Sequence, residues 1–364
     1  MGPTLRSQST KGVKFPVVCT TDIDIQILKD LLSHDELVLV AEKDLSKLIT
    51  NGDELDSFQT PFSDAPPAAH ESLGTFMDAR QSRDNISRKA FVILDGTTAE
   101  DGKTCQIATD GRQDERGDSI QIAFRCNLPS ATLSLVAVEE AAASTKAVRE
   151  LRNEAAMVGG QWDKQRVDEL RARPKRIDVE QYPIHDSWDE SSTPGSLDTD
   201  IPYFPIFQTA EVNLKTINKL LEETYDQDWG DEEIAGPSMA FVTSIDAPPF
   251  HSGKEGARLD SAPKTPAALL GASAVECDAI ARSRFSTEGS ELNYNMFIVL
   301  DDLTEKSETV LVAANNELDG QLVLTRSDFK SALTVLVAPQ DTRLTVDGQC
   351  NDAVTAGPGI VYDV

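Results

Sequence analysis

A chain of 364 residues has room for two domains, each large enough to bury a core of its own. Its 61 acidic residues outnumber its 34 basic ones, and the resulting net charge of −27 argues against nucleic acids and anionic membrane surfaces as partners. The five cysteines show no Cys-x-x-Cys spacing, which excludes a disulfide framework or a zinc ribbon and favours a reducing, cytoplasmic location.

The first half of the sequence predicts a tail followed by an α/β domain. Residues 1–12 are polar and predict a disordered tail. A strand, an amphipathic helix and a second strand follow within a few tens of residues, which is the pattern of a βαβ unit with a parallel crossover. We expect the first α/β domain to cover residues 13–140, with strands at 13–19, 37–40, 91–94, 105–108 and 120–124, and either a strand or the start of a helix at 134–138.

Two connecting segments follow this domain. Residues 141–173 are rich in Ala, Arg and Glu and predict a helical connector, weakened at Gly159 and Gly160. Residues 174–202 are rich in Pro, Ser and Asp and predict a surface linker. The only basic cluster, residues 171–176, lies where they meet; it is either a docking or localisation signal or a charged helix end.

The second half predicts another α/β domain over residues 203–364. Its helix is expected at 212–224, and residues 243–292 read as a Pro-rich insertion that takes the place of 41–89 in the first domain. The expected strands are 203–208, 239–242, 296–300, 309–314 and 321–325, followed by an apolar run at 333–337.

The two halves share motifs in the same order. The run Phe91 to Asp95, with Thr98 after it, recurs as Phe297 to Asp301, with Thr304 after it. The same order holds for Phe15-Pro16 and Phe204-Pro205, and for the Arg-x-x-apolar-x-Ser-Ala motifs that begin at Arg125 and Arg326. Burial explains why the apolar runs of the two halves resemble one another. It does not explain why the Pro, Asp, Thr, Arg and Ser residues around these runs match as well. The sequence therefore predicts two similar tandem α/β domains, each with a mixed sheet, related by internal duplication.

The motifs of common cofactor and catalytic sites are absent from the sequence. It contains no phosphate-binding loop, no Gly-x-Gly-x-x-Gly after a strand, no His-Glu-x-x-His and no Gly-x-Ser-x-Gly. The four histidines are scattered, so we expect neither a cofactor nor a metal site. Asp22-Ile23-Asp24 follows a strand and suits a divalent cation. We favour instead a capping box, in which Thr21 begins the next helix and Asp24 stands three residues later.

The candidate site residues lie where predicted central strands end. Asp95, Asp301 and Asp302 follow such strands, and ligands of open α/β sheets bind at that edge. Arg125 and Arg326 recur at equivalent positions and suit either structural ion pairs with these aspartates or an anionic ligand. The site is expected to be lined by Asp22 and Asp95 in the first domain or by Asp301, Asp302 and Arg326 in the second, which is the preferred place. Clustered carboxylates raise one another's pKa, so the aspartates are the acid–base candidates. The segment around His251 in its insertion is a candidate lid.

The order of these motifs also resembles that of a known family. Thr21-Asp22, followed by Phe91 to Asp95 and Thr98, is similar to an uncharacterised microbial family, a domain of unknown function, here in two diverged tandem copies. The second copy departs from the pattern, because Ala210-Glu211 stands where the Thr-Asp step is expected. The resemblance implies the fold and no activity.

Two kinds of function remain open. The first is a ligand-binding or protein-interaction protein whose partner is a small molecule or another protein. The second is a cofactor-independent enzyme of a biosynthetic pathway, such as an isomerase, cyclase or lyase, which needs only a shaped pocket and one or two carboxylates. A deep apolar pocket with a buried carboxyl of raised pKa would favour the enzyme.

Overall fold

The fold is described from a computed structural model. In it the chain divides into two compact units. Unit 1 comprises residues 1–170 with 354–357, and unit 2 comprises residues 171–353 with 358–364. The structure describes residues 12–62, 76, 79–80, 83, 85–109, 112–113, 119–120, 123–141, 145–179, 203–225, 239–245, 258–285, 292–315, 321–332 and 335–336. The expected tail at 1–11, most of the expected linker at 180–202 and His251 lie outside these residues.

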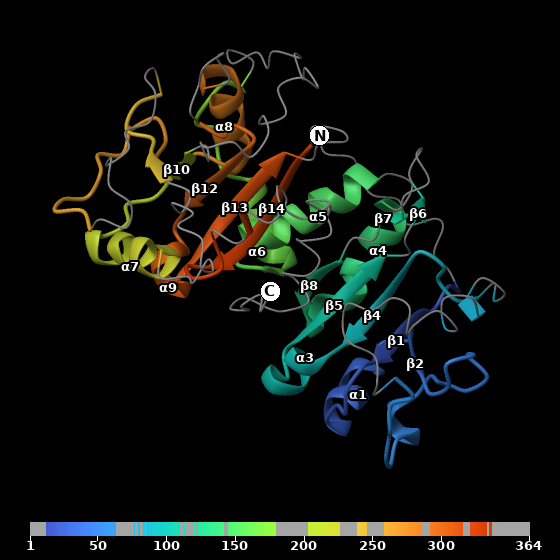
Figure 1. Ribbon diagram of the computed structural model, residues 1–364. Coiled ribbons are helices and arrows are strands. Elements are labelled where there is room, and N and C mark those ends of the chain that lie inside the picture. Colours follow the sequence, from blue (N-terminus) through green and yellow to red (C-terminus); the bar gives the residue numbers. More distant parts are fainter. Residues whose placement is uncertain are drawn as a thin grey trace. The chain divides into compact units, whose positions relative to one another are not determined.

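Unit 1 is built on a seven-stranded sheet in its described part, with strand order β3-β2-β1-β4-β5-β8-β9 (Figure 1). β1 runs parallel to both β2 and β4, whereas β5 is antiparallel to its neighbours β4 and β8. The strands are β1 Phe15–Cys19, β2 Leu37–Val40, β3 Leu48–Ile49, β4 Ala90–Leu94, β5 Thr104–Thr109, β8 Ala123–Asn127 and β9 Gln161–Trp162, and a separate pair is formed by β6 Arg112–Gln113 and β7 Ser119–Ile120.

The βαβ start that the sequence predicts is present. Helix α1 (Ile25–Leu31) connects the parallel strands β1 and β2, with Phe15 opposite Leu37. It begins after Asp24, whose carboxylate accepts a hydrogen bond from the backbone N–H of Gln26 at 2.7 Å. Asp24 is therefore the N-cap itself, and not the third residue of a helix that begins at Thr21 as expected from the sequence; such a cap contributes about 1 kcal/mol.

Both faces of the unit 1 sheet are buried. One face packs against α1 and three later helices, α4 (Ala131–Ala141), α5 (Thr145–Met157) and α6 (Lys164–Arg171). On the opposite face, Ile93 and Phe91 lie in a cluster with Phe62 and Phe76, whose ring meets that of Phe91 edge-on at a centroid distance of 5.3 Å. A central strand that is buried on both sides needs a continuous apolar run, which is what residues 90–94 supply. The remaining short helices are η1 Gly52–Glu54, α3 Gly96–Asp101 and η3 Leu128–Ser130.

Unit 2 is built on a five-stranded sheet in its described part, with strand order β11-β10-β12-β13-β14. Helix α7 (Leu214–Tyr225) connects the parallel strands β10 and β11 and buries Ile217 and Leu220 against one face. On the other face, Phe207 contacts both Phe285 and Phe297. The elements are β10 Phe204–Gln208, β11 Met239–Phe241, α8 Ala274–Ile280, the π-helical turn η6 Ala281–Phe285, β12 Met296–Leu300, α9 Thr304–Ser307, β13 Thr309–Asn315 and β14 Leu322–Asp328.

The five strands of unit 2 repeat the order and directions of β2-β1-β4-β5-β8 in unit 1. The registers agree as well: Val18 lies opposite Ile93 and Phe207 opposite Val299, between strands that are parallel in both cases. The backbone N–H of the following Thr, Thr20 or Thr209, donates to the carbonyl of Leu94 or Leu300 at 2.9 or 2.8 Å. The predicted class, mixed α/β with a βαβ start, is thus confirmed; common ancestry of the two units remains an inference.

Residues 134–138, which the sequence left open between a strand and the start of a helix, are helical, within α4. The sequence-based boundaries need correction at three places. The last strand of the repeated set is 123–127 rather than 120–124. The segment expected as a connector, 141–173, belongs to unit 1 as far as Leu170: α5 buries Leu151 and Ala155, and β9 pairs with β8. The linker was expected to begin at 174, but Ile177 is buried in unit 2, where its backbone N–H donates to Glu276 at 2.6 Å.

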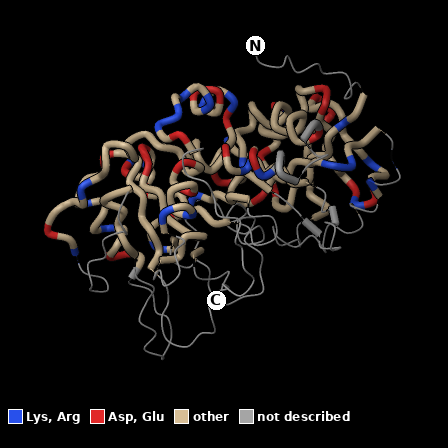
Figure 2. The backbone as a smooth tube through the Cα atoms, turned by 90° about the horizontal axis from the view of Figure 1, so that it is seen from above, with Lys and Arg blue, Asp and Glu red and all other residues tan. Residues whose placement is uncertain are grey.

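Basic and acidic residues are interspersed along the described chain (Figure 2). Acidic residues prevail over the whole sequence, with a net charge of −27. Within the described residues, no helix combines the length and apolarity needed to cross a membrane.

The central strands should carry much of the stability of each unit. Ile93 is buried among aromatic rings, so Ile93→Ala leaves a cavity and should lower the free energy of unfolding by about 2–4 kcal/mol; Val299→Ala in unit 2 should cost about 2 kcal/mol. Leu133, half exposed on α4, provides the control, and Leu133→Ala should cost less than about 0.5 kcal/mol. Urea unfolding curves measure all three; equal effects at Ile93 and Leu133 would contradict the assigned register.

Candidate functional site

The first candidate, Asp95, ends β4 and begins α3. It is the N-cap of that helix, and its Oδ1 accepts hydrogen bonds from the backbone N–H and the hydroxyl of Thr98, each at 3.0 Å. In return, the backbone N–H of Asp95 donates to the hydroxyl oxygen of Thr98 at 3.2 Å. This reciprocal capping box explains the Asp-x-x-Thr pattern of the sequence by local helix chemistry.

The other carboxylate oxygen of Asp95 pairs with Arg125, which comes from β8. Arg125 Nη2 contacts Asp95 Oδ2, and Nη1 donates to the hydroxyl of Thr104 at 3.1 Å. Both charged side chains are almost completely buried. An ion pair without solvent stabilises a fold only when further hydrogen bonds satisfy its atoms, and the two threonines supply several of these.

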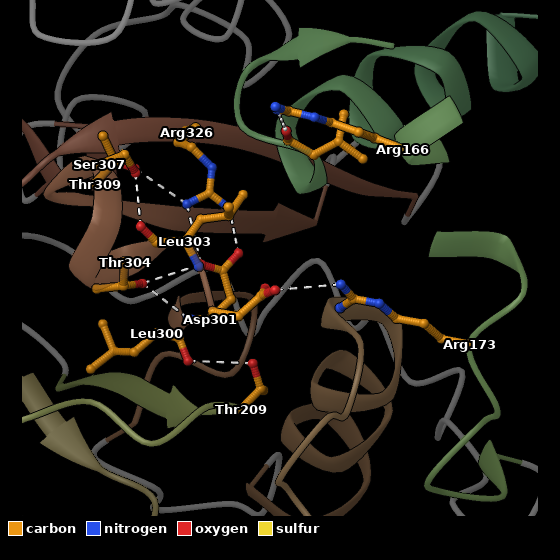
Figure 3. A network of polar contacts seen from close by, with 12 residues as sticks. Arg166, Arg173, Thr209, Leu300, Asp301, Leu303, Thr304, Ser307, Thr309 and Arg326 are labelled. Atoms are coloured by element: carbon orange, nitrogen blue, oxygen red, sulfur yellow. Dashed lines mark hydrogen bonds and ion pairs between the residues drawn. The ribbon is translucent and has the colours of Figure 1, made fainter. Parts of the chain in front are cut away.

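The same arrangement recurs in unit 2 with Asp301 and Arg326 (Figure 3). Asp301 Oδ1 accepts from the backbone N–H of Leu303 at 3.1 Å and from the hydroxyl of Thr304 at 3.2 Å. Arg326 Nη2 pairs with Asp301 Oδ2, and Nη1 donates to Thr309 at 3.2 Å. The Asp301 side chain is 14% exposed, whereas that of Asp95 is 2% exposed, so only the second network reaches solvent.

These contacts fit the structural alternative for Asp95, Asp301, Arg125 and Arg326. Each carboxylate uses both oxygens within the protein, and each guanidinium faces a carboxylate instead of an open space. Asp95 and Asp301 therefore each lie beside an arginine, which is the arrangement of a structural ion pair.

The neighbouring candidates are exposed. Asp302 follows Asp301 directly and is 52% exposed; its carboxylate lies 3.4 Å from Nη2 of Arg173, which is 57% exposed (Figure 3). Asp22 is exposed as well, while Asp95 is buried. His251 lies outside the described residues. Among those residues, no group of three or more His, Cys, Asp or Glu side chains is arranged to hold a metal ion.

One buried carboxyl was not identified from the sequence. Asp278 lies in α8 with a side chain that is 4% exposed; its Oδ2 pairs with Arg282 one turn later, and its Oδ1 accepts from Nδ2 of Asn315 at 2.9 Å. Burial raises the pKa of Asp278 above its ordinary value, although Arg282 and Asn315 act in the opposite direction. Asn315 Oδ1 is buried and has no hydrogen-bond partner in the described structure.

The backbone around Asp278 is unusual, because α8 continues directly into the π-helical turn η6, which contains Arg282. Such turns occur frequently at functional sites. The signal in the sequence is a pair of opposite charges four residues apart within the otherwise apolar run 277–282. This run falls in the segment 243–292, which the sequence predicts as an insertion.

A second carboxyl of α8 has a structural role. Glu276 forms a capping box with Ser273, and it also accepts from the backbone N–H groups of Arg176 and Ile177, each at 2.6 Å. Burial alone would raise the pKa of Glu276, but these hydrogen bonds lower it below its ordinary value. Glu276 thus acts as an acceptor that joins residues 176–177 to α8.

Comparisons of the chain with protein-family models, with curated proteins and with solved structures found no match. The site must therefore be interpreted from its own geometry.

Removal of one partner of a buried pair should cost more than removal of both. Arg125→Met leaves the Asp95 carboxylate buried without its counter-ion, and it should destabilise unit 1 by about 3–5 kcal/mol. In the double variant Asp95→Asn/Arg125→Met the loss should be smaller, because Asn still caps α3 and no buried charge remains. Arg326→Met should cost less than Arg125→Met, since Asp301 reaches solvent. Urea unfolding measures these differences; a double variant as unstable as Arg125→Met would contradict the ion-pair assignment.

The raised pKa of Asp278 predicts a pH dependence of stability. The native fold holds the proton of this carboxyl more tightly than the unfolded chain does. Its contribution is therefore fully present below the unfolded-state pKa of about 3.9 and is lost as pH rises through the folded-state pKa. The Asp278→Asn variant has no proton to lose here, so its stability relative to the wild type should increase as pH rises above about 4. Thermal unfolding between pH 4 and 8 tests this; a difference that stays constant with pH would contradict it.

Proposed function

We propose that the chain is a binding protein whose recognition surface lies at the carboxyl end of β12 in unit 2. The observation that carries the proposal is the difference in exposure between two consecutive aspartates. Asp301 is fixed in a buried network, and Asp302, the next residue, holds its carboxylate half exposed to solvent. The partner is a small molecule or a protein segment that carries positive charge.

The buried network supports recognition because it fixes the backbone on which Asp302 is displayed. The hydrogen bonds that Asp301 accepts from Leu303 and Thr304, together with the Arg326 pair, restrain residues 301–304 before any ligand arrives. A preorganised surface loses less conformational entropy on binding than a mobile one.

The present partner of Asp302 is exchangeable. The Arg173 and Asp302 side chains are both more than half exposed and lie 3.4 Å apart, and exposed pairs of this kind contribute little to stability. A cationic group of a ligand can therefore replace Arg173 at modest cost. The overall net charge of −27 attracts such a ligand and increases its rate of association.

Three further proposals accompany this function. The described cysteines Cys19, Cys105, Cys126 and Cys277 are free thiols, which supports a reducing compartment such as the cytoplasm. The shared strand order and the repeated Asp, Arg and Thr network support an internal duplication. The same residues support the resemblance to the uncharacterised microbial family, which has no known activity.

A cofactor-independent enzyme is the second candidate, and Asp278 is the observation that favours it. A buried carboxyl with a raised pKa keeps its proton to higher pH than a solvated one, and it can exchange that proton with a substrate. The neighbouring Asn315 Oδ1, a buried acceptor, could then accept a hydrogen bond from that substrate. In this alternative the reaction includes a proton transfer to or from a small molecule, as in an isomerase, a cyclase or a lyase.

A thermal-shift screen of small amines and basic metabolites tests the binding function. A ligand at the proposed surface should raise the midpoint of the wild type and lose most of this effect in Asp302→Asn. Asp168→Asn is the matched control, because Asp168 is 53% exposed and forms a similar surface pair with Lys164 on α6. Equal ligand responses in the two variants would place binding elsewhere.

The same screen separates the enzyme from the binder. A ligand that is chemically converted by the wild type, and is bound but not converted by Asp278→Asn, would favour the enzyme. A ligand that is bound unchanged by both proteins and lost only in Asp302→Asn would favour the binder. Product analysis by mass spectrometry or NMR provides the measurement.

A further inference from the structure

Two cysteines of unit 1 lie on neighbouring strands of the sheet, with their side chains facing each other. Cys105 in β5 and Cys126 in β8 are directly opposite in an antiparallel pair, and their Sγ atoms are 3.5 Å apart. Both side chains are buried. We propose that this dithiol is a modification site, at which a peroxide forms an intrachain disulfide that clamps β5 to β8.

The backbone is already suited to the bond. Opposite residues of antiparallel strands have Cα atoms about 4.5–5.5 Å apart, which falls within the range that disulfides require. The sulfur atoms need to approach from 3.5 Å to about 2.05 Å, a change that side-chain rotation can supply. Closure therefore requires no change of strand register.

The cysteine pair is not a requirement of the fold. In unit 2 the equivalent position of the sheet is occupied by Val310 and Ser327, which lie opposite each other in β13 and β14. An apolar residue and a small polar one satisfy the same packing there, so two facing thiols are a particular feature of unit 1. The other described cysteines, Cys19 and Cys277, lie in β1 and α8.

The chemistry balances with a peroxide as the oxidant. One thiol, as its thiolate, attacks a peroxide oxygen and becomes a sulfenic acid with release of water. The second thiolate then attacks the sulfenic sulfur, forms the S–S bond and expels the other oxygen as water. Two thiols and one hydrogen peroxide thus give one disulfide and two waters, and two electrons pass from the sulfurs to the peroxide.

The fold makes this reaction slow but lasting. The hydrogen bond with Cys126 and burial raise the pKa of the Cys105 thiol, so few thiolates form in the closed sheet. Oxidation therefore proceeds when β5 and β8 separate briefly. Once formed, the disulfide links residues 21 positions apart and lies next to Thr104 and Arg125, which hold Asp95. The product is a unit 1 in which the central network is covalently clamped.

The test treats the full chain with hydrogen peroxide, alkylates the remaining thiols under denaturing conditions and analyses tryptic peptides by mass spectrometry. Trypsin cleaves after Lys103, Arg112, Arg125 and Lys146, so the disulfide should join peptide 104–112 to peptide 126–146. The thermal midpoint of unit 1 should rise by about 5–10 °C after oxidation. Loss of thiols without this cross-linked peptide would overturn the proposal.

Two variants make the result specific. Cys105→Val/Cys126→Ser copies the pair found in unit 2, so it should fold, and its midpoint should not rise with peroxide. The addition of Val310→Cys/Ser327→Cys to that variant should transfer the cross-link to unit 2. An equal rise in the Cys105→Val/Cys126→Ser variant would show that oxidation elsewhere stabilises the chain and would overturn the proposal.

Discussion

The two units depend on one interaction, a buried Asp–Arg pair at the end of the central strand. Asp95 joins three elements at once: it ends β4, caps α3 and neutralises Arg125 of β8. Because each charge would be costly to bury alone, the three elements are stable only in the arrangement that brings the pair together. Asp301 and Arg326 impose the same constraint in unit 2. The buried pair therefore contributes more to the specificity of the fold than to its free energy of unfolding.

The two copies of the pair differ in their surroundings. In unit 1 both side chains of the pair are buried, and β8, which carries Arg125, is flanked by β9 in the sheet. In unit 2 Asp301 keeps some contact with solvent, and the next residue displays a second carboxylate. A repeated scaffold can thus remain sealed in one copy and present a recognition surface in the other, because recognition needs only the residues beside the pair.

The sequence predicts the elements better than the edges of the units. The runs at 91–94 and 297–300 were readily identified, because a strand buried on both faces must be apolar throughout, and the repeated Asp, Thr and Arg residues marked the network. Strand β9 has only two residues, which are too few to show the alternation of apolar and polar residues that is typical of a strand. Its place beside β8 could therefore not be predicted. Asp278 was missed because burial of a carboxyl depends on Asn315, which is distant in the sequence. The proposed dithiol was equally hidden, since Cys105 and Cys126 become neighbours only through register.

The contact between Glu276 and residues 176–177 changes what a protease cut would do. The long segment of unit 1 ends at Leu170, and Arg176 and Ile177 are already docked on α8. The first covalent junction between the units is therefore the short segment 171–175, and a cut within 180–202 falls after it. A chain nicked there would keep residues 176–177 bound to α8 without a peptide bond, so its two fragments should migrate together in native gel filtration and separate only on denaturation.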